Sequence, residues 1–189
     1  IFIDDVDLMR CDITSLRNEI AYVPQDNFLF SDKVSNNISF GRRNASFEKI
    51  RDAAIFADVN DNIVNFKEGY DTVSGERGVT LSGGQKQRIS IARAYIKESP
   101  IMIMDDSVSA VDVKTEETIL KHIKENRKNM TTLVVASRIS TVMNLDKILV
   151  LDEGKVVGYD SHKELIKTCP VYQKMVYLQE LEREVEGGK

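Results

Sequence analysis

The chain has 189 residues, which is long enough for one sizeable hydrophobic core or for one domain with an inserted subdomain. Hydrophobic residues make up 42% and charged residues 30% of the composition, as is typical of soluble globular proteins, and the net charge of -4 does not favour a nucleic-acid partner. The two cysteines, Cys11 and Cys169, have no partners at metal-ligand spacing, so we expect neither a disulfide framework nor a metal cluster.

The first part of the chain predicts two short strands and then a helix. Residues 1–3 indicate the end of a strand, and the apolar residues 20–23 indicate a second strand that Pro24 stops. Gln25 then opens a loop, and apolar residues at helical spacing predict a helix from Ser46 to about residue 64. Because the chain begins at Ile1, without Met or a signal peptide, we expect it to be a piece of a larger protein.

The second part alternates helices with apolar runs. The uniform apolarity of residues 101–104 and 132–136 predicts strands that are buried on both faces, as in a parallel sheet. A third run, residues 148–151, turns back into residues 155–157, and Ser161 to Glu164 has the pattern of a capping box. The helices that we expect here cover residues 84–97 and 115–128, a short segment closed by Val142, a segment ending near Thr168, and a final helix from Val171 before a polar tail at 186–189.

This order of elements predicts an α/β fold, with a helical insertion between Phe40 and Ser99. Apolar runs stay well short of the roughly 20 residues that a membrane-spanning helix needs.

The stretch Leu81-Ser82-Gly83-Gly84-Gln85 precedes a strongly helical segment. Glycines allow a ligand to approach the backbone, and the first turn of a helix presents unpaired N–H groups with partial positive charge. The serine hydroxyl and the glutamine amide add donors, so the stretch predicts a site for a phosphate-like anion. The alternative interpretation is an ordinary helix cap, since serine followed by glycine often begins a helix.

Asp105 and Asp106 follow directly after the strand predicted at residues 101–104. They therefore lie at the carboxyl edge of the sheet, where open α/β folds bind ligands. An aspartate in this place commonly holds Mg²⁺ beside nucleotide phosphates. The alternative is a strand-to-helix turn in which Asp106 or Ser107 only caps the following helix.

Together these motifs resemble the nucleotide-binding domain of an ABC transporter of the exporter type, and the resemblance covers nearly the whole chain in the right order. Residues 81–85 match the family signature, residues 101–106 match its Walker B strand, and residues 109–112 follow its D-loop. Gln25 matches the Q-loop glutamine, and residues 71–78 resemble the segment that couples exporters to their membrane helices. The fold that this implies is the parallel-sheet core of a P-loop NTPase, without its N-terminal part.

The resemblance implies ATP and Mg²⁺ as cofactors and a second nucleotide-binding domain as partner. Ser82, Gly83, Gly84 and Gln85, with Leu81 before them, would clasp the γ-phosphate of the ATP that the partner binds. Asp105 and Gln25 would serve the metal ion of this chain's own nucleotide, and Asp112 would communicate across the dimer. The parent chain would carry a transmembrane domain and hold this domain at the cytoplasmic face of a membrane.

The chain departs from the family pattern at three places. It contains no GxxxxGK[ST] motif, which in the family lies upstream of Ile1, so we expect the fragment to bind ATP poorly by itself. Asp106 stands where hydrolysing members carry the catalytic glutamate, and the shorter side chain withdraws the carboxylate by about 1.5 Å. Ser137 replaces the histidine of the switch region and offers no imidazole to position the γ-phosphate and the water.

Two changes in one site suggest slow hydrolysis, while the signature is intact. We therefore expect the chain to be the degenerate half of a heterodimeric exporter ATPase, with a non-identical partner domain. The alternatives are an active homodimeric exporter ATPase in which Asp106 suffices, a soluble ATP-switch protein of the same family, and a purely regulatory binding module. The expected organisation is an α/β core of residues 1–40 and 99–168, a helical subdomain of residues 41–98 with the signature, and a C-terminal helix and tail of residues 169–189.

Overall fold

The computed structural model describes residues 1–75 and 80–187. The chain divides into two compact units, Ile1–Val135 and Ala136–Lys189. Within the described ranges, no helix has both the length and the apolar character that crossing a membrane requires.

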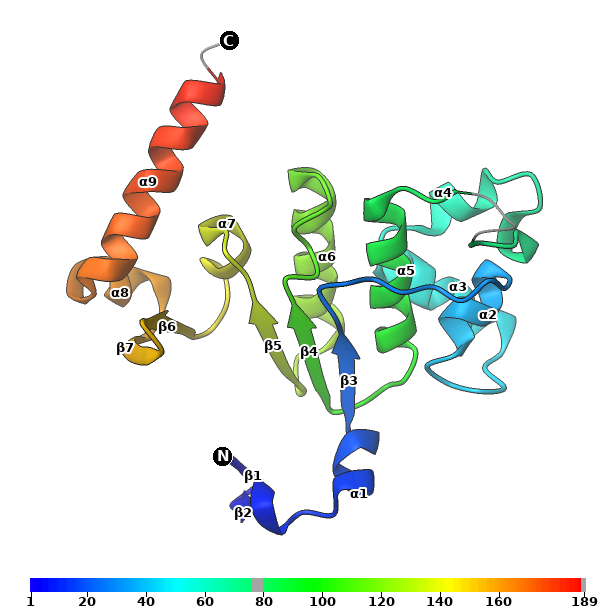
Figure 1. Ribbon diagram of the computed structural model, residues 1–189, viewed down its shortest axis with the longest axis horizontal. Helices are drawn as coiled ribbons and strands as arrows, with labels where there is room; N and C mark the ends of the chain where they lie inside the picture. Colours follow the sequence, from blue (N-terminus) through cyan, green and yellow to red (C-terminus); the bar gives the residue numbers. More distant parts are fainter. Residues whose placement is uncertain (76–79, 188–189) are drawn as a thin grey trace. The chain divides into compact units, whose positions relative to one another are not determined.

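The first unit is built on a parallel sheet of β3 (Ile20–Val23), β4 (Ile101–Asp105) and β5 (Thr131–Val135), in that order (Figure 1). Tyr22 lies opposite Ile103, which lies opposite Leu133. Ahead of the sheet, β1 (Phe2–Ile3) and β2 (Val6–Asp7) form a small antiparallel hairpin, followed by the 3-10 helix η1 (Leu8–Arg10) and by α1 (Ile13–Asn18). The predicted strands and their parallel arrangement are confirmed.

The helices of this unit gather beside the sheet, with α2 to α5 beyond its β3 edge (Figure 1). The helix predicted from Ser46 to residue 64 is in fact two helices, because the chain adopts a positive φ of 54° at Asp58 and turns there. The helices are α2 (Val34–Ser39), α3 (Phe47–Phe56), α4 (Asn60–Val64), the 3-10 helix η2 (Gly69–Asp71), α5 (Gly83–Tyr95) and α6 (Val113–Asn126).

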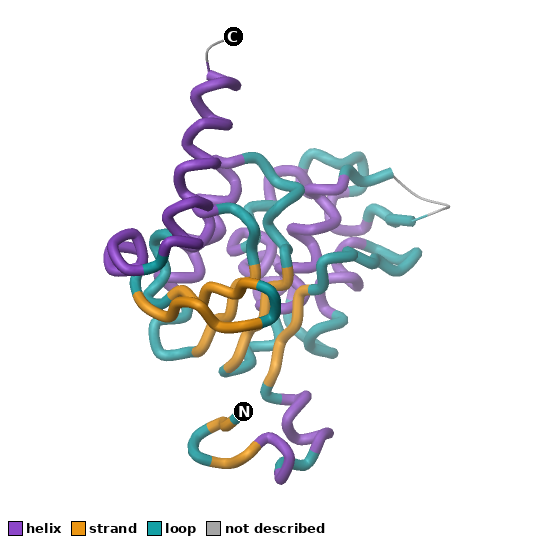
Figure 2. The backbone as a smooth tube through the Cα atoms, turned by 60° about the vertical axis from the view of Figure 1, so that its left-hand side comes forward, coloured by secondary structure: helices purple, strands orange, loops and turns teal. Residues whose placement is uncertain are grey.

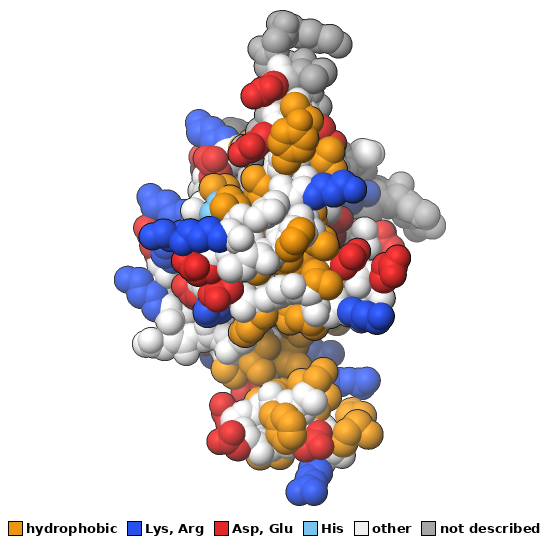
Figure 3. Space-filling model, turned by 90° about the vertical axis from the view of Figure 1, so that its left-hand side faces the viewer, with side chains coloured by type: hydrophobic (Ala, Val, Ile, Leu, Met, Phe, Trp, Pro, Cys, Tyr) orange, Lys and Arg blue, Asp and Glu red, His pale blue; other side chains and the backbone are white. Residues whose placement is uncertain are grey.

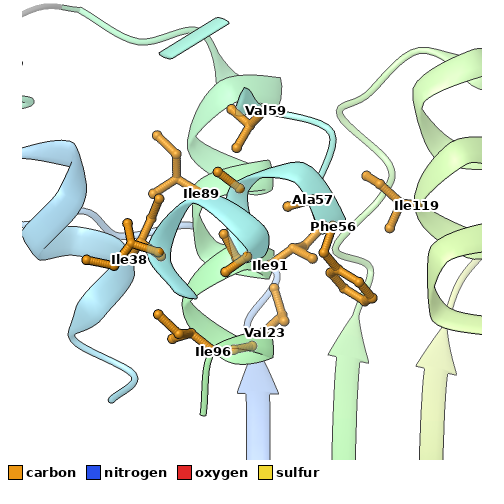
Figure 4. Packing of buried hydrophobic residues seen from close by; sticks show 14 of the residues in the cluster. Val23, Ile38, Phe56, Ala57, Val59, Ile89, Ile91, Ile96 and Ile119 are labelled. Carbon is orange, nitrogen blue, oxygen red and sulfur yellow. The ribbon is translucent and has the colours of Figure 1, made fainter. Parts of the chain in front are cut away.

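The core of the first unit joins these helices to one face of the sheet (Figure 4). Val23, Met102 and Met104 are fully buried on that face. Each such side chain contributes about 1.5–3 kcal/mol by leaving water. From the helices, Ile91 and Ile119 are buried in the same cluster.

The prediction of burial on both faces is wrong for β5. Leu133 is 54% exposed and Val135 is 49% exposed, and Tyr22 on β3 is 53% exposed. Successive side chains of a strand point to opposite faces, and the described helices cover the face that carries Met102 and Met104. The run is apolar on both faces, but only one face is packed within the part of the chain that the structure describes.

The second unit contains α7 (Ile139–Val142), the antiparallel hairpin of β6 (Ile148–Asp152) and β7 (Lys155–Asp160), α8 (His162–Thr168) and α9 (Pro170–Gly187) (Figure 2). The hairpin turns at Glu153 and Gly154, both with positive φ. Its core consists of Ile139, Ile148, Val150, Leu165, Cys169 and Tyr172.

The capping box predicted from Ser161 to Glu164 does not form among the described residues. Ser161 precedes α8, but its side chain makes no cap hydrogen bond there. Glu164 instead lies 3.0 Å from Lys167, and Asp160 accepts the N–H of Ser161 at 2.8 Å. The neighbouring lysine and aspartate have taken the partners that the capping box would have used.

Candidate functional site

The acidic side chains predicted at the carboxyl edge of the sheet lie where β4 ends, beside the loop that follows β3. Because Val23 is paired with Met104, Gln25 and Asp106 follow the same edge. The amide nitrogen Nε2 of Gln25 lies 3.5 Å from Oδ2 of Asp106, in donor geometry. The structure therefore brings together Gln25, Asp105 and Asp106 from two neighbouring strands.

Tyr22 is a neighbour of this site that the sequence reasoning did not single out. Its hydroxyl donates a hydrogen bond of 2.9 Å to Oδ2 of Asp105. This bond, and to a smaller extent burial, raises the pKa of the Tyr22 phenol above its usual value. The signal was present in the sequence, since Tyr22 alternates with the buried Val23 and therefore projects from the other face of the sheet.

The oxygen donors at this edge fit a magnesium ion that is also bound by a nucleotide. Mg²⁺ prefers oxygen ligands, keeps several waters, and is usually held by one or two carboxylates together with substrate phosphates. Asp105 and the amide oxygen of Gln25 are donors of that kind. Within residues 1–75 and 80–187, no group of three or more His, Cys, Asp or Glu side chains forms a protein-only metal site.

Asp106 sits in a strained turn that several neighbours hold. Its φ is 43°, a left-handed value that aspartate tolerates better than most residues. Its N–H donates to the carbonyl of Val135 at 2.9 Å, and its carbonyl accepts from the Ser109 hydroxyl at 2.9 Å. Gln87 of α5 is 1% exposed, donates to the same carbonyl at 3.2 Å, and accepts the N–H of Ala110 at 3.1 Å. Gln87, which sequence reasoning missed, thus ties α5 to the turn after β4.

The stretch at residues 81–85 forms the start of α5 and is a complete capping box. The Ser82 hydroxyl oxygen accepts the N–H of Gln85 at 3.2 Å, and Oε1 of Gln85 accepts the N–H of Ser82 at 3.0 Å. Leu81 anchors the stretch because it is 4% exposed. The cap uses only the acceptor oxygens, so it leaves the hydroxyl proton of Ser82 and the amide protons of Gln85 as donors. The cap and the anion site are therefore compatible.

The two glycines differ in what surrounds them. A Cβ added to Gly84 would lie 3.1 Å from the carbonyl oxygen of Ala110, so Gly84 permits the close approach of α5 to residues 109–112. A Cβ added to Gly83 would meet no heavy atom of the described residues within 4 Å. Packing within the described chain explains Gly84 and leaves the glycine at Gly83 unexplained.

Asp112 begins α6 at the far end of the same turn. Its carboxylate accepts the N–H of Thr115 at 3.0 Å. This bond lowers the pKa of Asp112 below its usual value, and the nearby cation of Arg88 adds a smaller effect in the same direction. The carboxylate is thus committed to capping α6, beside the start of α5.

Ser137 belongs to the second unit, between β5 and α7, and it is exposed. Its main-chain carbonyl accepts a hydrogen bond of 2.8 Å from Nε2 of Gln179 in α9.

The segment predicted to couple to membrane helices, residues 71–78, is described as far as Gly75; Glu76, Arg77 and Gly78 lie outside the described residues. Its described part is tied to residues 31–33. Asp71 forms an ion pair of 2.8 Å with Lys33. The main chains of Lys33 and Val73 pair in an isolated antiparallel β-bridge.

Next to this segment, Phe28, Phe30 and Phe40 form an exposed aromatic surface. Arg93 of α5 holds this surface from within. It donates to the carbonyl of Phe28 at 2.9 Å, and its guanidinium lies over the rings of Phe30 and Phe40 at 5.5 and 5.9 Å. Two further bonds of 2.8 Å reach the main-chain carbonyl and the side chain of Asn37. Arg93 therefore connects α5 to the aromatic surface.

Residues 1–109 match the family model described as ABC transporter. The chain is 44% identical, over 92% of its length, to the ATP-binding cassette sub-family B member 6 of Xenopus tropicalis, and 43% identical, over 95%, to the ATP-dependent lipid A-core flippase of Wigglesworthia glossinidia brevipalpis. It spans 20% and 31% of those relatives. A solved structure, of a bacterial Atm1-family ABC exporter with ATP bound, is similar with a TM-score of 0.90 and 41% identity over 95% of this chain and 32% of that one.

Proposed function

The chain belongs to the ABC transporter family, and on that premise we propose that it is the ATP-binding domain of an exporter. In this proposal, ATP binding and hydrolysis at the interface of two such domains drive export. The chain spans between a fifth and about a third of the length of the relatives reported above, so the activity of the whole protein is part of the proposal.

The observation that carries the proposal is the start of α5. Ser82 and Gly83 are exposed, a side chain at Gly83 would meet open space within the described chain, and the donors of Ser82 and Gln85 remain available. A helix of 13 residues presents partial positive charge at this end. Local packing does not require a glycine at position 83. The γ-phosphate of an ATP bound by the partner would fill the space beside Gly83 and explain why no side chain stands there.

At the carboxyl edge of the sheet, Asp105 and Gln25 would hold the Mg²⁺ of this chain's own ATP. The ion would neutralise charge on the phosphates when it is bound. The chain's own part is to supply oxygen donors from the ends of two adjacent strands, with Tyr22 fixing the orientation of Asp105 through its hydrogen bond of 2.9 Å. Asp112, beside the start of α5, would face the partner domain.

The same proposal makes this chain the slowly hydrolysing half of a heterodimer. Asp106 has a short side chain in the place of a catalytic glutamate, and a base displaced by about 1 Å can lose about 100-fold in rate. Ser137 offers a hydroxyl in the place of an imidazole. With an intact signature, the chain would complete the competent site of a non-identical partner while it contributes little turnover itself.

The aromatic surface of Phe28, Phe30 and Phe40, with the adjoining residues 71–75, would dock the transmembrane domain of the parent chain. Exposed aromatic side chains are favoured anchors at protein interfaces, and Arg93 connects them to α5. The domain would thus lie at the cytoplasmic face of a membrane. For its internal organisation we retain an α/β core of residues 1–40 and 99–168, a helical subdomain of residues 41–98, and a C-terminal segment of residues 169–189.

A charge at Gly83 tests the central part of the proposal. In the full-length protein paired with its partner domain, Gly83→Asp places a carboxylate against the γ-phosphate, and we expect ATP turnover to fall at least tenfold. Thermal stability stays unchanged, because the added atoms enter open space and an acidic residue suits a helix N-terminus. Gly83→Ala is the control without charge and retains more activity. Normal turnover by Gly83→Asp would refute the role of this stretch.

A further inference from the structure

The short helix α7 depends on a residue far away in the sequence for its first hydrogen bond. The N–H groups of a helix's first turn lack partners inside the helix. Arg138 precedes α7, and an arginine side chain has no oxygen atom with which to cap it. The cap comes from α9, where Oε1 of Gln179 accepts the N–H of Ile139 at 2.7 Å.

The side-chain amide of Gln179 also forms a hydrogen bond on the other side of Arg138, to Ser137. Its Nε2 donates to the carbonyl of Ser137 at 2.8 Å. A planar amide that binds a carbonyl and the N–H two residues later fixes both sides of the intervening residue, and both distances lie toward the short end of the usual range. We name this pair of bonds the Gln179 clamp.

The base of the clamp is anchored. Tyr172, two turns earlier in α9, is 1% exposed, and its hydroxyl lies 2.8 Å from Nδ1 of His162 in α8. Gln173 donates to the carbonyl of Ile166 at 2.6 Å. The start of α9 is therefore fixed to α8, and Gln179 reaches the residues before α7 from a firm support.

The side chain of Gln179 borders a pocket rather than filling a close-packed core. A pocket of about 100 Å³ lies between α7, α8 and α9, and Gln179 lines it together with Ile139, Met143 and Val176. The two amide bonds therefore hold residues 137–139 together with the packing of the buried Ile139 side chain. Tyr177 and Leu178 precede Gln179 on α9, and both are exposed. Figure 3 shows acidic, basic and hydrophobic side chains interspersed on the face that it presents.

We propose that Gln179 is a positioning residue for Ser137, because its clamp holds the main chain of residues 137–139 while the Ser137 side chain stays exposed to a ligand. This inference rests on the proposed function, in which Ser137 meets the phosphates of ATP. It makes α9 a control element, since any movement of α9 away from α7 releases the segment that carries Ser137.

The test compares two methionine variants of α9 in the full-length protein with its partner domain. Gln179→Met keeps length and helix propensity but removes both bonds of the clamp. Lys174→Met is the matched control, because it places a methionine at an exposed position of the same helix, away from residues 137–139. The measurements are hydrogen exchange at the amide of Ile139 and the dissociation rate of ATP from this chain's site, with Ser137→Ala as a third variant.

We expect Gln179→Met to speed exchange at Ile139 about tenfold and ATP dissociation about fivefold, since loss of one hydrogen bond corresponds to changes of this order. Lys174→Met changes neither. Unchanged exchange at Ile139, or faster exchange with unchanged ATP dissociation while Ser137→Ala speeds it, overturns the positioning role. If neither Ser137→Ala nor Gln179→Met alters ATP dissociation, the proposed role of Ser137 itself fails, and the inference fails with it.

Discussion

The bridge that Gln87 makes between α5 and the turn after β4 leads to a quantitative prediction. Gln87→Met keeps the length and apolar stem of a side chain that is 1% exposed, but it removes the bonds to the carbonyl of Asp106 and the N–H of Ala110. Each net hydrogen bond contributes about 0.5–1.5 kcal/mol, so the loss of both lowers the free energy of unfolding by about 2 kcal/mol. The Asp106 carbonyl keeps its bond from Ser109, which prevents a larger loss.

For a chain of this length, such a loss lowers the melting temperature by about 4–8 °C. Thermal and urea unfolding of the variant and the parent measure it, with Lys86→Met as a control at an exposed position on the same helix, which we expect to stay within about 0.5 kcal/mol. If Gln87→Met costs no more than the control, the bridge does not contribute to the native state. The link between α5 and the turn that carries Asp106 would then lose its physical basis.

Two further predictions concern Gly41, which follows α2, and Tyr70, which lies in η2. Gly41→Ala places a Cβ against the main-chain carbonyl of Arg93, so thermal unfolding will show a free energy of unfolding that is lower by about 1–3 kcal/mol. Gly83→Ala adds its Cβ in open space and changes this free energy little. Burial raises the pKa of Tyr70 to about 12. Because the unfolded value is near 10, Tyr70 stabilises the fold fully below about pH 10 and loses that contribution as the pH rises toward 12. Melting temperatures across this range will fall less steeply for Tyr70→Phe, and an equal slope in both proteins would contradict this origin.

The strands and the start of α5 could be predicted from the sequence because their causes are local. Uniform apolar runs flanked by Pro24, Pro100 and acidic residues define β3 and β4, and Ser82 with Gln85 carries the whole capping box. Gln25 and Asp106 lie close together because parallel strands end at a common edge, although the sequence alone assigned Gln25 only through the family resemblance.

The parts that could not be predicted depend on competing local contacts or on residues that lie far apart in the sequence. The break at Asp58 interrupts an apolar periodicity that continues across it. The capping pattern at Ser161 gave way to an ion pair of Glu164 with Lys167. The bonds of Gln87 and Gln179 join residues that lie 19 and 40 positions apart, and no local pattern distinguishes such glutamines from exposed ones.

The central claim, that this chain is the slowly hydrolysing half of a heterodimeric exporter, is tested most directly by ATP turnover of the full-length protein. Turnover is measured for the protein alone and with its partner, each with Asp106→Ala and Asp106→Glu variants. We predict that the protein alone is nearly inactive. With the partner present, ATP turnover is restored and is the same for the Asp106→Ala variant as for the unmodified protein. High turnover by the protein alone that Asp106→Ala abolishes would contradict the claim and would make Asp106 a working base.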